Sequence, residues 1–333
     1  MTGSQITDTA ACHSPTAAML RSYVDGDLRR LVRAWTSAAS QDGMTERRFR
    51  DLILLDRNFD ERGLVIAERD GEVIGASYAV RRRVAHVGAD TEPQTGWIPF
   101  FFVVPAARGR GLGRSLVVAS LDWLRSAGAR EVFFSCYTPN YVLPGLDAAR
   151  YPEASALLAS LGFTLHEQPS AMDRSLIGYR IPDDIRDRIE VLRAEGWSLG
   201  TATDDDLVPL VRVAGDAFNS DWARVIREGV AAGTLPLERI IVAKNPDGEV
   251  IGWAQHGTYE QVIERFGPFG VLPQSRGTGL GKVILHLTLE RMTALGAHSA
   301  WFLWADEGST ASKLYEKTGF AVSRTFDILR AEL

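Results

Sequence analysis

Three segments in the first half of this chain recur in the same order in its second half. The most similar pair is the hexapeptide DGEVIG, which starts at Asp70 and again, unchanged, at Asp247. The pairs are Asp70–Gly75 with Asp247–Gly252, Val103–Arg114 with Val271–Lys282, and Ala154–Phe163 with Ala311–Phe320, at offsets of 177, 168 and 157 residues. Similarity repeated at long spacing indicates duplicated structural units. The 333 residues therefore predict two copies of one fold, each large enough to bury its own core.

Hydrophobic spacing predicts the same order of elements in both copies: a strand, two helices, three strands, a helix, a strand, a helix and a strand. In the first copy, Asp70 and Gly71 predict a hairpin turn, and Phe100–Val104 predicts a buried strand. Between the copies, the charged amphipathic segment Pro182–Glu195 predicts a connecting helix. The expected organisation is an N-terminal domain over residues 1–181, with residues 1–18 disordered, the connecting helix over residues 182–195, and a C-terminal domain over residues 196–333.

The composition excludes several functional classes. Lys and Arg number 37 against 42 Asp and Glu, so the net charge of −5 gives no general attraction for nucleic acid or an anionic membrane. Cys12 and Cys136 are too few for a disulfide framework or a four-ligand zinc site. Residues 1–18 lack the basic start and apolar core of a secretory signal. We therefore expect a cytoplasmic protein with no metal and no nucleic-acid or membrane partner.

The most informative segment is a glycine-rich loop that joins a strand to a helix in each copy. Its sequence is RGRGLG at Arg108–Gly113 and RGTGLG at Arg276–Gly281. Such a loop lets backbone N–H groups approach an anion, and the positive end of the helix dipole adds to the attraction. The glycine spacing differs from that of the Walker loop and from the GxGxxG of dinucleotide-binding folds. Two such loops predict two sites for a phosphate or pyrophosphate.

Both loops resemble the signature [RQ]-x-x-G-x-[GA] of the GCN5-related N-acetyltransferases (GNATs). A second landmark of that family, A-x-x-L-Y-x-x-x-G-F, stands in full at Ala311–Phe320. The resemblance covers nearly the whole chain. It implies an α/β (α+β) fold of two tandem acyl-CoA N-acyltransferase domains, each a mixed, mostly antiparallel splayed sheet with helices on both faces.

The resemblance also implies that acetyl-CoA is the cofactor, with its pyrophosphate in the loop and its pantetheine along the preceding strand. The residues implied to bind it are Val103, Val104, Arg108, Gly109, Arg110, Gly111, Leu112, Gly113 and Arg114 in the first copy, and Val271, Leu272, Arg276, Gly277, Thr278, Gly279, Leu280, Gly281 and Lys282 in the second.

The same resemblance favours the second copy as the catalytic one. Tyr315 stands where the family has the tyrosine that protonates the coenzyme A thiolate. The first copy has Leu158 at the aligned position, and a leucine cannot donate a proton. Because the attacking amine must be neutral, a base or a desolvated site must help as well. The candidates are Glu264 and Glu260, close before the motif strand, His256, on a strand, and Asp306 and Glu307, after the next strand.

The first copy has a longer segment, Ser135–Pro152, before its last helix. Its three tyrosines, Tyr137, Tyr141 and Tyr151, predict a substrate wall or lid near the cofactor cleft. Alternatively, the segment packs its own rings as a compact surface loop. If one of these tyrosines supplies the proton that Leu158 cannot, the first copy is the active one.

The expected function is the transfer of an acetyl group from acetyl-CoA to a primary amine of a small molecule, by direct attack. The resemblance suggests this acceptor, because tandem members of the family acetylate small amines such as amino sugars and the mycothiol precursor. Two alternatives stand beside it. One is a coenzyme A-binding regulatory or scaffold protein without turnover, and the other is the same fold acting on another acyl group or an O-acceptor.

Overall fold

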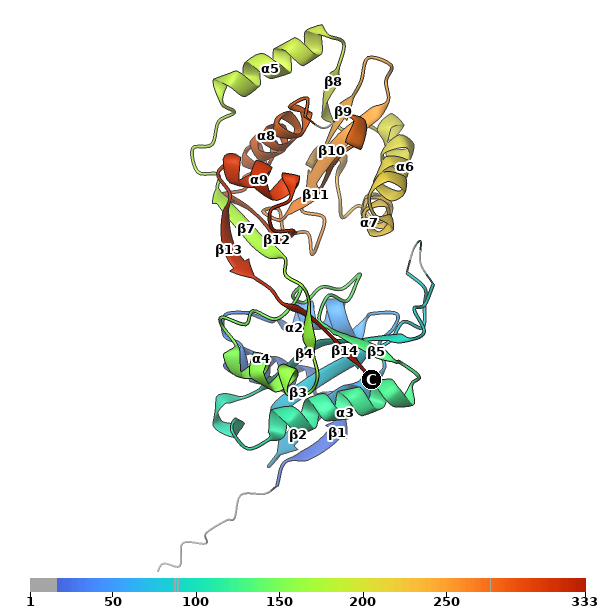
Figure 1. The fold of residues 1–333 in the computed structure, drawn as a ribbon, viewed down its shortest axis with the longest axis vertical. Coiled ribbons are helices and arrows are strands. Elements are labelled where there is room, and N and C mark those ends of the chain that lie inside the picture. The colour runs from blue at the N-terminus through green and yellow to red at the C-terminus, as the bar shows by residue number, and fades with distance from the viewer. Residues whose placement is uncertain (1–16, 87, 89, 276) are drawn as a thin grey trace, which may run out of the picture. The chain divides into compact units, whose positions relative to one another are not determined.

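The computed structural model describes residues 17–86, 88, 90–275 and 277–333 (Figure 1). The chain divides into two compact units, residues 1–80 with 100–128 and residues 81–99 with 129–333. Most of the predicted disordered segment 1–18, and Arg276 of the second glycine loop, lie outside the described residues.

The first unit holds one half of a β-sheet with helices on both faces. Its elements are β1 (Met19–Ser22), α1 (Leu28–Ala38), α2 (Glu46–Phe49), β2 (Leu64–Arg69), β3 (Glu72–Val80), the end of β4 (Thr95–Val103) and α3 (Leu112–Ser126). Trp35 of α1 packs against Phe100 and Phe102 of β4. Leu116 of α3 packs with Val103. Because neighbouring strand residues point to opposite faces, α1 and α3 cover different faces of β4.

The second unit carries the remaining elements. They are the start of β4, β5 (Glu131–Phe134), α4 (Pro152–Ala159), β6 (Thr164–Glu167), β7 (Ser170–Ser175), α5 (Asp183–Ala194), β8 (Ser198–Thr201), α6 (Leu207–Ala217), α7 (Ser220–Ala231), β9 (Ile240–Lys244), β10 (Val250–His256), β11 (Phe266–Val271), α8 (Leu280–Ala294), β12 (Ser299–Ala305), α9 (Thr310–Lys317), β13 (Ala321–Thr325) and β14 (Ile328–Glu332). A single-turn π-helix, Arg50–Leu54, and several 3₁₀ turns complete the chain.

Three sheets are formed, with the strand orders β1-β2-β3-β4-β5-β14-β6, β11-β10-β9-β8 and β12-β7-β13. The pair β4–β5 is parallel, whereas β2–β3, β9–β10 and β10–β11 are antiparallel. The strand predicted at Phe100–Val104 starts earlier, at Thr95, because Thr95–Ile98 pair with β5. The sheets are thus mixed and mostly antiparallel.

Each copy gives one strand to the sheet of the other. The last strand of the chain, β14, pairs between β5 and β6 of the first copy, with Leu329 opposite Phe134. In return β7, which precedes the connecting helix, pairs between β12 and β13 of the second copy, with Asp173 opposite Trp301. The sequence repeats did not predict this exchange.

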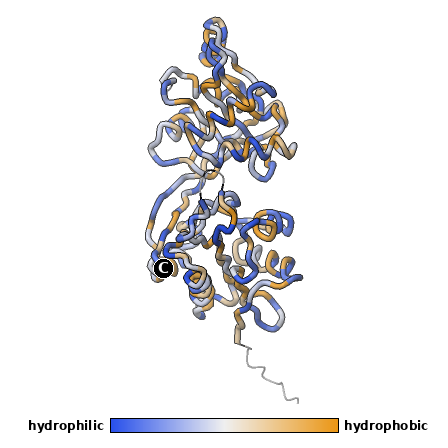
Figure 2. The backbone as a smooth tube through the Cα atoms, turned by 90° about the vertical axis from the view of Figure 1, so that its right-hand side faces the viewer, coloured by the Kyte–Doolittle hydropathy of each residue, from blue (hydrophilic) through white to orange (hydrophobic). Residues whose placement is uncertain are grey.

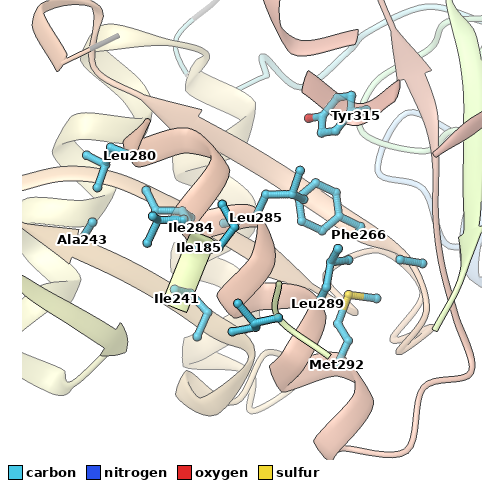
Figure 3. Packing of buried hydrophobic residues seen from close by; sticks show 14 of the residues in the cluster. Ile185, Ile241, Ala243, Phe266, Leu280, Ile284, Leu285, Leu289, Met292 and Tyr315 are labelled. Atoms are coloured by element: carbon cyan, nitrogen blue, oxygen red, sulfur yellow. The ribbon is translucent and has the colours of Figure 1, made fainter. Parts of the chain in front are cut away.

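The core of the second copy is organised around α8. Hydrophobic side chains of α5, β9, β10, β12 and α9 pack against Leu280, Ile284, Leu285 and Leu289 of this helix (Figure 3). Among the described residues, no helix has the length and hydrophobicity that a membrane span requires, and Figure 2 shows hydrophobic residues in short runs between hydrophilic ones. No cluster of three or more His, Cys, Asp or Glu in that part of the chain could hold a metal ion.

Candidate functional site

The two glycine loops have the same backbone geometry. Gly109 and Gly111 have φ angles of 75° and 80°, and Gly277 and Gly279 have 80° and 84°. These angles lie in the left-handed region that side chains other than glycine rarely adopt. Gly111 and Gly279 are the N-caps of α3 and α8 and have no side chain to cap the helix, and the Thr278 hydroxyl accepts the Leu280 N–H at 3.4 Å.

The loop geometry fits an anionic ligand. The first-turn N–H groups of α3 and α8 have no intrahelical partners, so each helix presents donors and a positive dipole end to its loop. A side chain added at Gly109, Gly111, Gly277 or Gly279 would meet nothing within 4 Å, so the space above each loop is open. The arrangement therefore matches the pyrophosphate site that the sequence predicts in both copies.

The strand that leads into each loop separates from its parallel neighbour. In the first copy the β4–β5 pairing ends at Ile98 and Phe134, whereas β4 continues to Val103. In the second copy β11 and β12 share only a bridge between Arg265 and Trp301 and belong to different sheets. The separated strands leave backbone amides of β4 and β11 available to an extended ligand, as the predicted pantetheine path requires.

The basic residues near the loops differ in what they contact. Arg108 donates from Nε to the Val103 carbonyl (3.0 Å) and from a terminal nitrogen to the Ala38 carbonyl (2.8 Å), so it fixes the loop to the strand and to α1. Arg110 and Arg114 are exposed. In the second copy the Lys282 ammonium lies 3.1 Å from the Asp184 carboxylate. Thr278 donates its hydroxyl to the Ser275 carbonyl at 2.8 Å.

Tyr315 lies on α9 in an aromatic enclosure at the same end of the second copy as the loop. Its ring centroid is 4.5 Å from that of Phe302 and 6.1 Å from that of Phe269, which stands on the strand before the loop. A side chain at Gly281 would lie 3.5 Å from Phe269 and 3.6 Å from Leu314, the residue before Tyr315. Phe269 of β11, Gly281 in the first turn of α8 and Leu314 of α9 therefore lie close to one another, next to Tyr315.

The chemistry of Tyr315 follows from its surroundings. The side chain is 8% exposed, and its hydroxyl has no hydrogen-bond partner among the described residues. Burial raises the pKa of Tyr315 well above its usual value, so the group stays protonated and able to donate. Leu158, at the aligned position on α4 of the first copy, is fully buried.

His256 has the surroundings of a structural residue. Its Nδ1 lies 2.9 Å from the Ile263 carbonyl, which can only accept a hydrogen bond, so Nδ1 carries the proton. The imidazole is fully buried, and Nε2 has no partner in the described part of the chain. Burial lowers the pKa of His256 to about 4, outweighing the opposite effect of the Ile263 carbonyl. This environment disfavours the role of general base that the sequence suggested for it.

The buried His256 predicts a loss of stability in acid. An unfolded His takes up a proton near pH 6.5, whereas the folded side chain stays neutral down to about pH 4. Protons therefore favour the unfolded chain, and the free energy of unfolding should fall between these pH values by on the order of 2–3 kcal/mol for this residue. Urea unfolding of His256→Gln at pH 7 and pH 5 should show a smaller difference than the wild type, whereas exposed His298→Gln should not. An unchanged pH dependence in His256→Gln would contradict this assignment.

Glu264 stands directly before β11 and is half-buried. Its carbonyl accepts the Trp301 N–H at 3.0 Å, which holds the residue where β11 and β12 begin to separate. The preceding loop has two residues other than glycine with positive φ, Glu260 at 56° and Gln261 at 57°. Such conformations cost free energy and are commonly found at ligand sites.

The predicted substrate tyrosines lie in different surroundings. Tyr137 is buried, with its ring 5.5 Å from that of Trp97, and is a core residue. Tyr151 is the N-cap residue of α4. Tyr141 instead lies with its ring 6.4 Å from that of Trp304, at the end of β12 in the second copy.

Tyr141 belongs to a polar group that the sequence analysis missed. Burial, followed by the nearby Tyr259 and Asp221, raises the pKa of Tyr141. Tyr259 lies under the Arg265 guanidinium at 4.5 Å. Burial alone would raise the pKa of Asp221, but the His86 ring at 3.0 Å and the Arg224 guanidinium, which donates a hydrogen bond at 2.8 Å, outweigh it and lower that pKa.

The repeat itself holds a signal for this group. By the offsets of 177 and 168 residues, Tyr259 and Arg265 correspond to Arg82 and Trp97. In the first copy the Arg82 guanidinium lies 4.6 Å from the Trp97 ring centroid. The same two positions thus form a cation–π pair in both copies, with the cation and the ring exchanged.

Comparisons with known proteins agree with this geometry. The acetyltransferase (GNAT) family model matches residues 26–143, and a GNAT domain model matches residues 236–322. A mycothiol acetyltransferase of Streptomyces avermitilis is 28% identical over 260 residues, covering 73% of this chain and 74% of the relative.

Two solved structures share the fold over nearly the whole chain. A GCN5-related glucosamine N-acetyltransferase region of a fungal multi-domain β-N-acetylglucosaminidase has a TM-score of 0.76 and 19% identity, covering 96% of this chain and 38% of that one. A tandem GNAT protein from the clavulanic acid biosynthesis pathway has a TM-score of 0.65 and 16% identity, and the match covers 95% of this chain and 98% of that one. The predicted tandem GNAT fold is confirmed, as is acetyl-CoA as the cofactor. The chain belongs to the GNAT acetyltransferase family as a tandem member, and it is an acetyl-CoA-dependent N-acetyltransferase.

Proposed function

We propose that the second copy transfers the acetyl group of acetyl-CoA to a primary amine of a small molecule, and that Tyr315 donates the proton that the departing thiolate takes up. The observation that carries the proposal is the difference between the copies. A protonated tyrosine lies beside the second loop, where the first copy has the buried Leu158. The first copy, whose loop is intact, is proposed to bind the cofactor without turnover.

Each residue of the proposed site has a separate role in the acetyl transfer. Acetyl-CoA, when bound, supplies the thioester whose carbonyl carbon the amine nitrogen attacks. Glu264 is proposed to take the proton that the nitrogen loses, directly or through a water molecule. Tyr315 gives its phenolic proton to the sulfur as the carbon–sulfur bond breaks, and the burial that keeps this proton on the oxygen at neutral pH supports the role. The available backbone N–H groups of β11 are suited to stabilise the developing negative charge on the carbonyl oxygen.

The amine acceptor is proposed to bind beside a group of four side chains, those of Tyr141, Tyr259, Asp221 and Trp304. Aromatic rings and a carboxylate together suit an amine that arrives as a cation. The similarity to a mycothiol acetyltransferase supports a small-molecule amine as the acceptor.

Thiol release from acetyl-CoA tests this proposal. We expect thiol release with the mycothiol precursor or with an amino sugar such as glucosamine. Mass spectrometry should then detect the acetylated amine in an equal amount. A lysine-containing peptide at the same concentration should give no more than the background hydrolysis. Release with none of the amines, while acetyl-CoA still binds, would instead support a regulatory or scaffold protein. Release with the peptide alone would contradict the small-molecule acceptor.

A further inference from the structure

The connecting helix α5 is packed onto the helix that starts at the second glycine loop. Ile185, Ile189 and Leu192 of α5 are buried in the same cluster as Leu280 and Ile284 of α8. Figure 3 shows Ile185 beside Ile284 in this cluster. The apolar face of α5 thus fixes its position against the first turns of α8.

This docking brings two charged side chains of α5 to the loop. The Arg188 guanidinium lies 3.4 Å from the carbonyl oxygen of Thr278, the residue between the two left-handed glycines of the loop. Asp184, one turn earlier, lies with its carboxylate 3.1 Å from the Lys282 ammonium in the first turn of α8. Residues four apart lie on one side of a helix, so Asp184 and Arg188 form a charged edge along the loop.

The contact with Arg188 sets the orientation of one peptide group. In a planar trans peptide the C=O and the following N–H point in opposite directions. A Thr278 carbonyl held by Arg188 therefore directs the Gly279 N–H away from α5. A Cβ added at Gly279 would meet no atom within 4 Å, so the space next to this peptide group is open.

The contact with Asp184 is an ion pair with Lys282, a cation in the first turn of α8. Both side chains are exposed, 67% for Asp184 and 39% for Lys282, and exposed ion pairs are weak. A pyrophosphate at the helix N-terminus carries more negative charge than one carboxylate and has the N–H donors beside it. The Lys282 ammonium can therefore leave the Asp184 carboxylate and pair with the phosphates of the bound cofactor.

We propose that α5 is part of the cofactor site of the second copy. Arg188 positions the Thr278–Gly279 peptide for the phosphates, and Asp184 lowers the affinity by competing with them for Lys282. The helix that joins the copies thus sets the acetyl-CoA affinity of the second copy. This inference rests on the proposed function, in that the second loop must bind acetyl-CoA.

Calorimetric titration of acetyl-CoA tests the inference in a full-length chain whose first loop is blocked by Gly111→Glu. We expect Arg188→Gln to weaken binding about tenfold, and Arg188→Lys, which keeps a charged donor, to restore part of the loss. Asp184→Asn should tighten binding about two- to fivefold, as expected for release of an exposed ion pair. That gain should disappear when Lys282→Met is added. In steady state, Arg188→Gln should raise KM for acetyl-CoA with little change in kcat.

Matched controls lie on the same helix. Asp183 and Arg186 pair with each other and are exposed, so Asp183→Asn and Arg186→Gln make the same charge changes away from the loop. They should change the affinity less than twofold. Equal effects of Arg186→Gln and Arg188→Gln, with binding still abolished by Gly279→Glu, would overturn the inference and leave the proposed function standing. If Gly279→Glu leaves binding unchanged, the second copy does not hold the cofactor, and the proposed function fails with it. If Gly111→Glu impairs folding, Arg114→Glu, in the ordinary backbone of α3, serves as the block.

Discussion

Replacing Tyr315 with phenylalanine is expected to lower kcat about a hundredfold, the lower end of what a positioned proton donor contributes. The acetyl-CoA affinity should stay within twofold of the wild type, because the change removes one oxygen atom from an aromatic enclosure and leaves the glycine loop intact. Stopped-flow detection of thiol release gives kcat, and calorimetry gives the affinity. Turnover unchanged in Tyr315→Phe would show that another group protonates the thiolate.

Two further measurements keep this result interpretable. Tyr179→Phe also removes a phenolic hydroxyl, a half-buried one that packs against the core of the second copy and lies 2.6 Å from Nδ1 of His286, and should leave kcat nearly unchanged. The pH dependence of the wild type adds an independent check. Because burial raises the pKa of Tyr315, the proton donor should not titrate as the pH rises to 10, and kcat should show no alkaline loss from this group.

The second large effect is expected at Leu329, in the exchanged strand β14. Leu329 is buried, and β14 pairs on both sides, with β5 and with β6. Leu329→Asp would bury a carboxylate without a partner, at a cost of several kcal/mol, a large part of the roughly 5–15 kcal/mol that holds a folded domain together. We expect a fall in Tm of about 10 °C or more and loss of a single cooperative transition.

The control for Leu329→Asp is an equivalent change on the preceding strand of the chain, which belongs to another sheet. Val322 of β13 is 55% exposed, so Val322→Asp places the same charge in water and should shift Tm only slightly. Differential scanning calorimetry on both variants makes the comparison. If Leu329→Asp melts like Val322→Asp, β14 does not complete the sheet with β5 and β6.

The sequence predicted those parts of the fold that depend on local patterns. The hairpin at Asp70, the glycine loops, and the strand and helix that flank each loop follow from spacing and residue type alone. The repeat then predicted that Tyr315 and Leu158 occupy corresponding helices, and they do lie on α9 and α4.

The strand exchange was not predictable in the same way. Ile328–Glu332 reads only as a short final strand, and nothing in its own residues says which neighbour it pairs with. Pairing between strands far apart in the chain depends on tertiary packing, which overrides local preference. The same holds for Tyr141, whose neighbour Trp304 lies far away in the sequence. The surroundings that disfavour His256 as a base were hidden for a related reason, because its burial and its contact with the Ile263 carbonyl are tertiary features.

The central claim is that the second copy performs the transfer, and the most direct test blocks one loop at a time. Thiol release should be measured in Gly111→Glu and Gly279→Glu, with Arg114→Glu and Lys282→Glu as variants whose backbone is helical. A carboxylate in either loop repels the pyrophosphate. We expect the second-copy variants to lose turnover and the first-copy variants to keep most of it. Loss of turnover in the first-copy variants alone would contradict it.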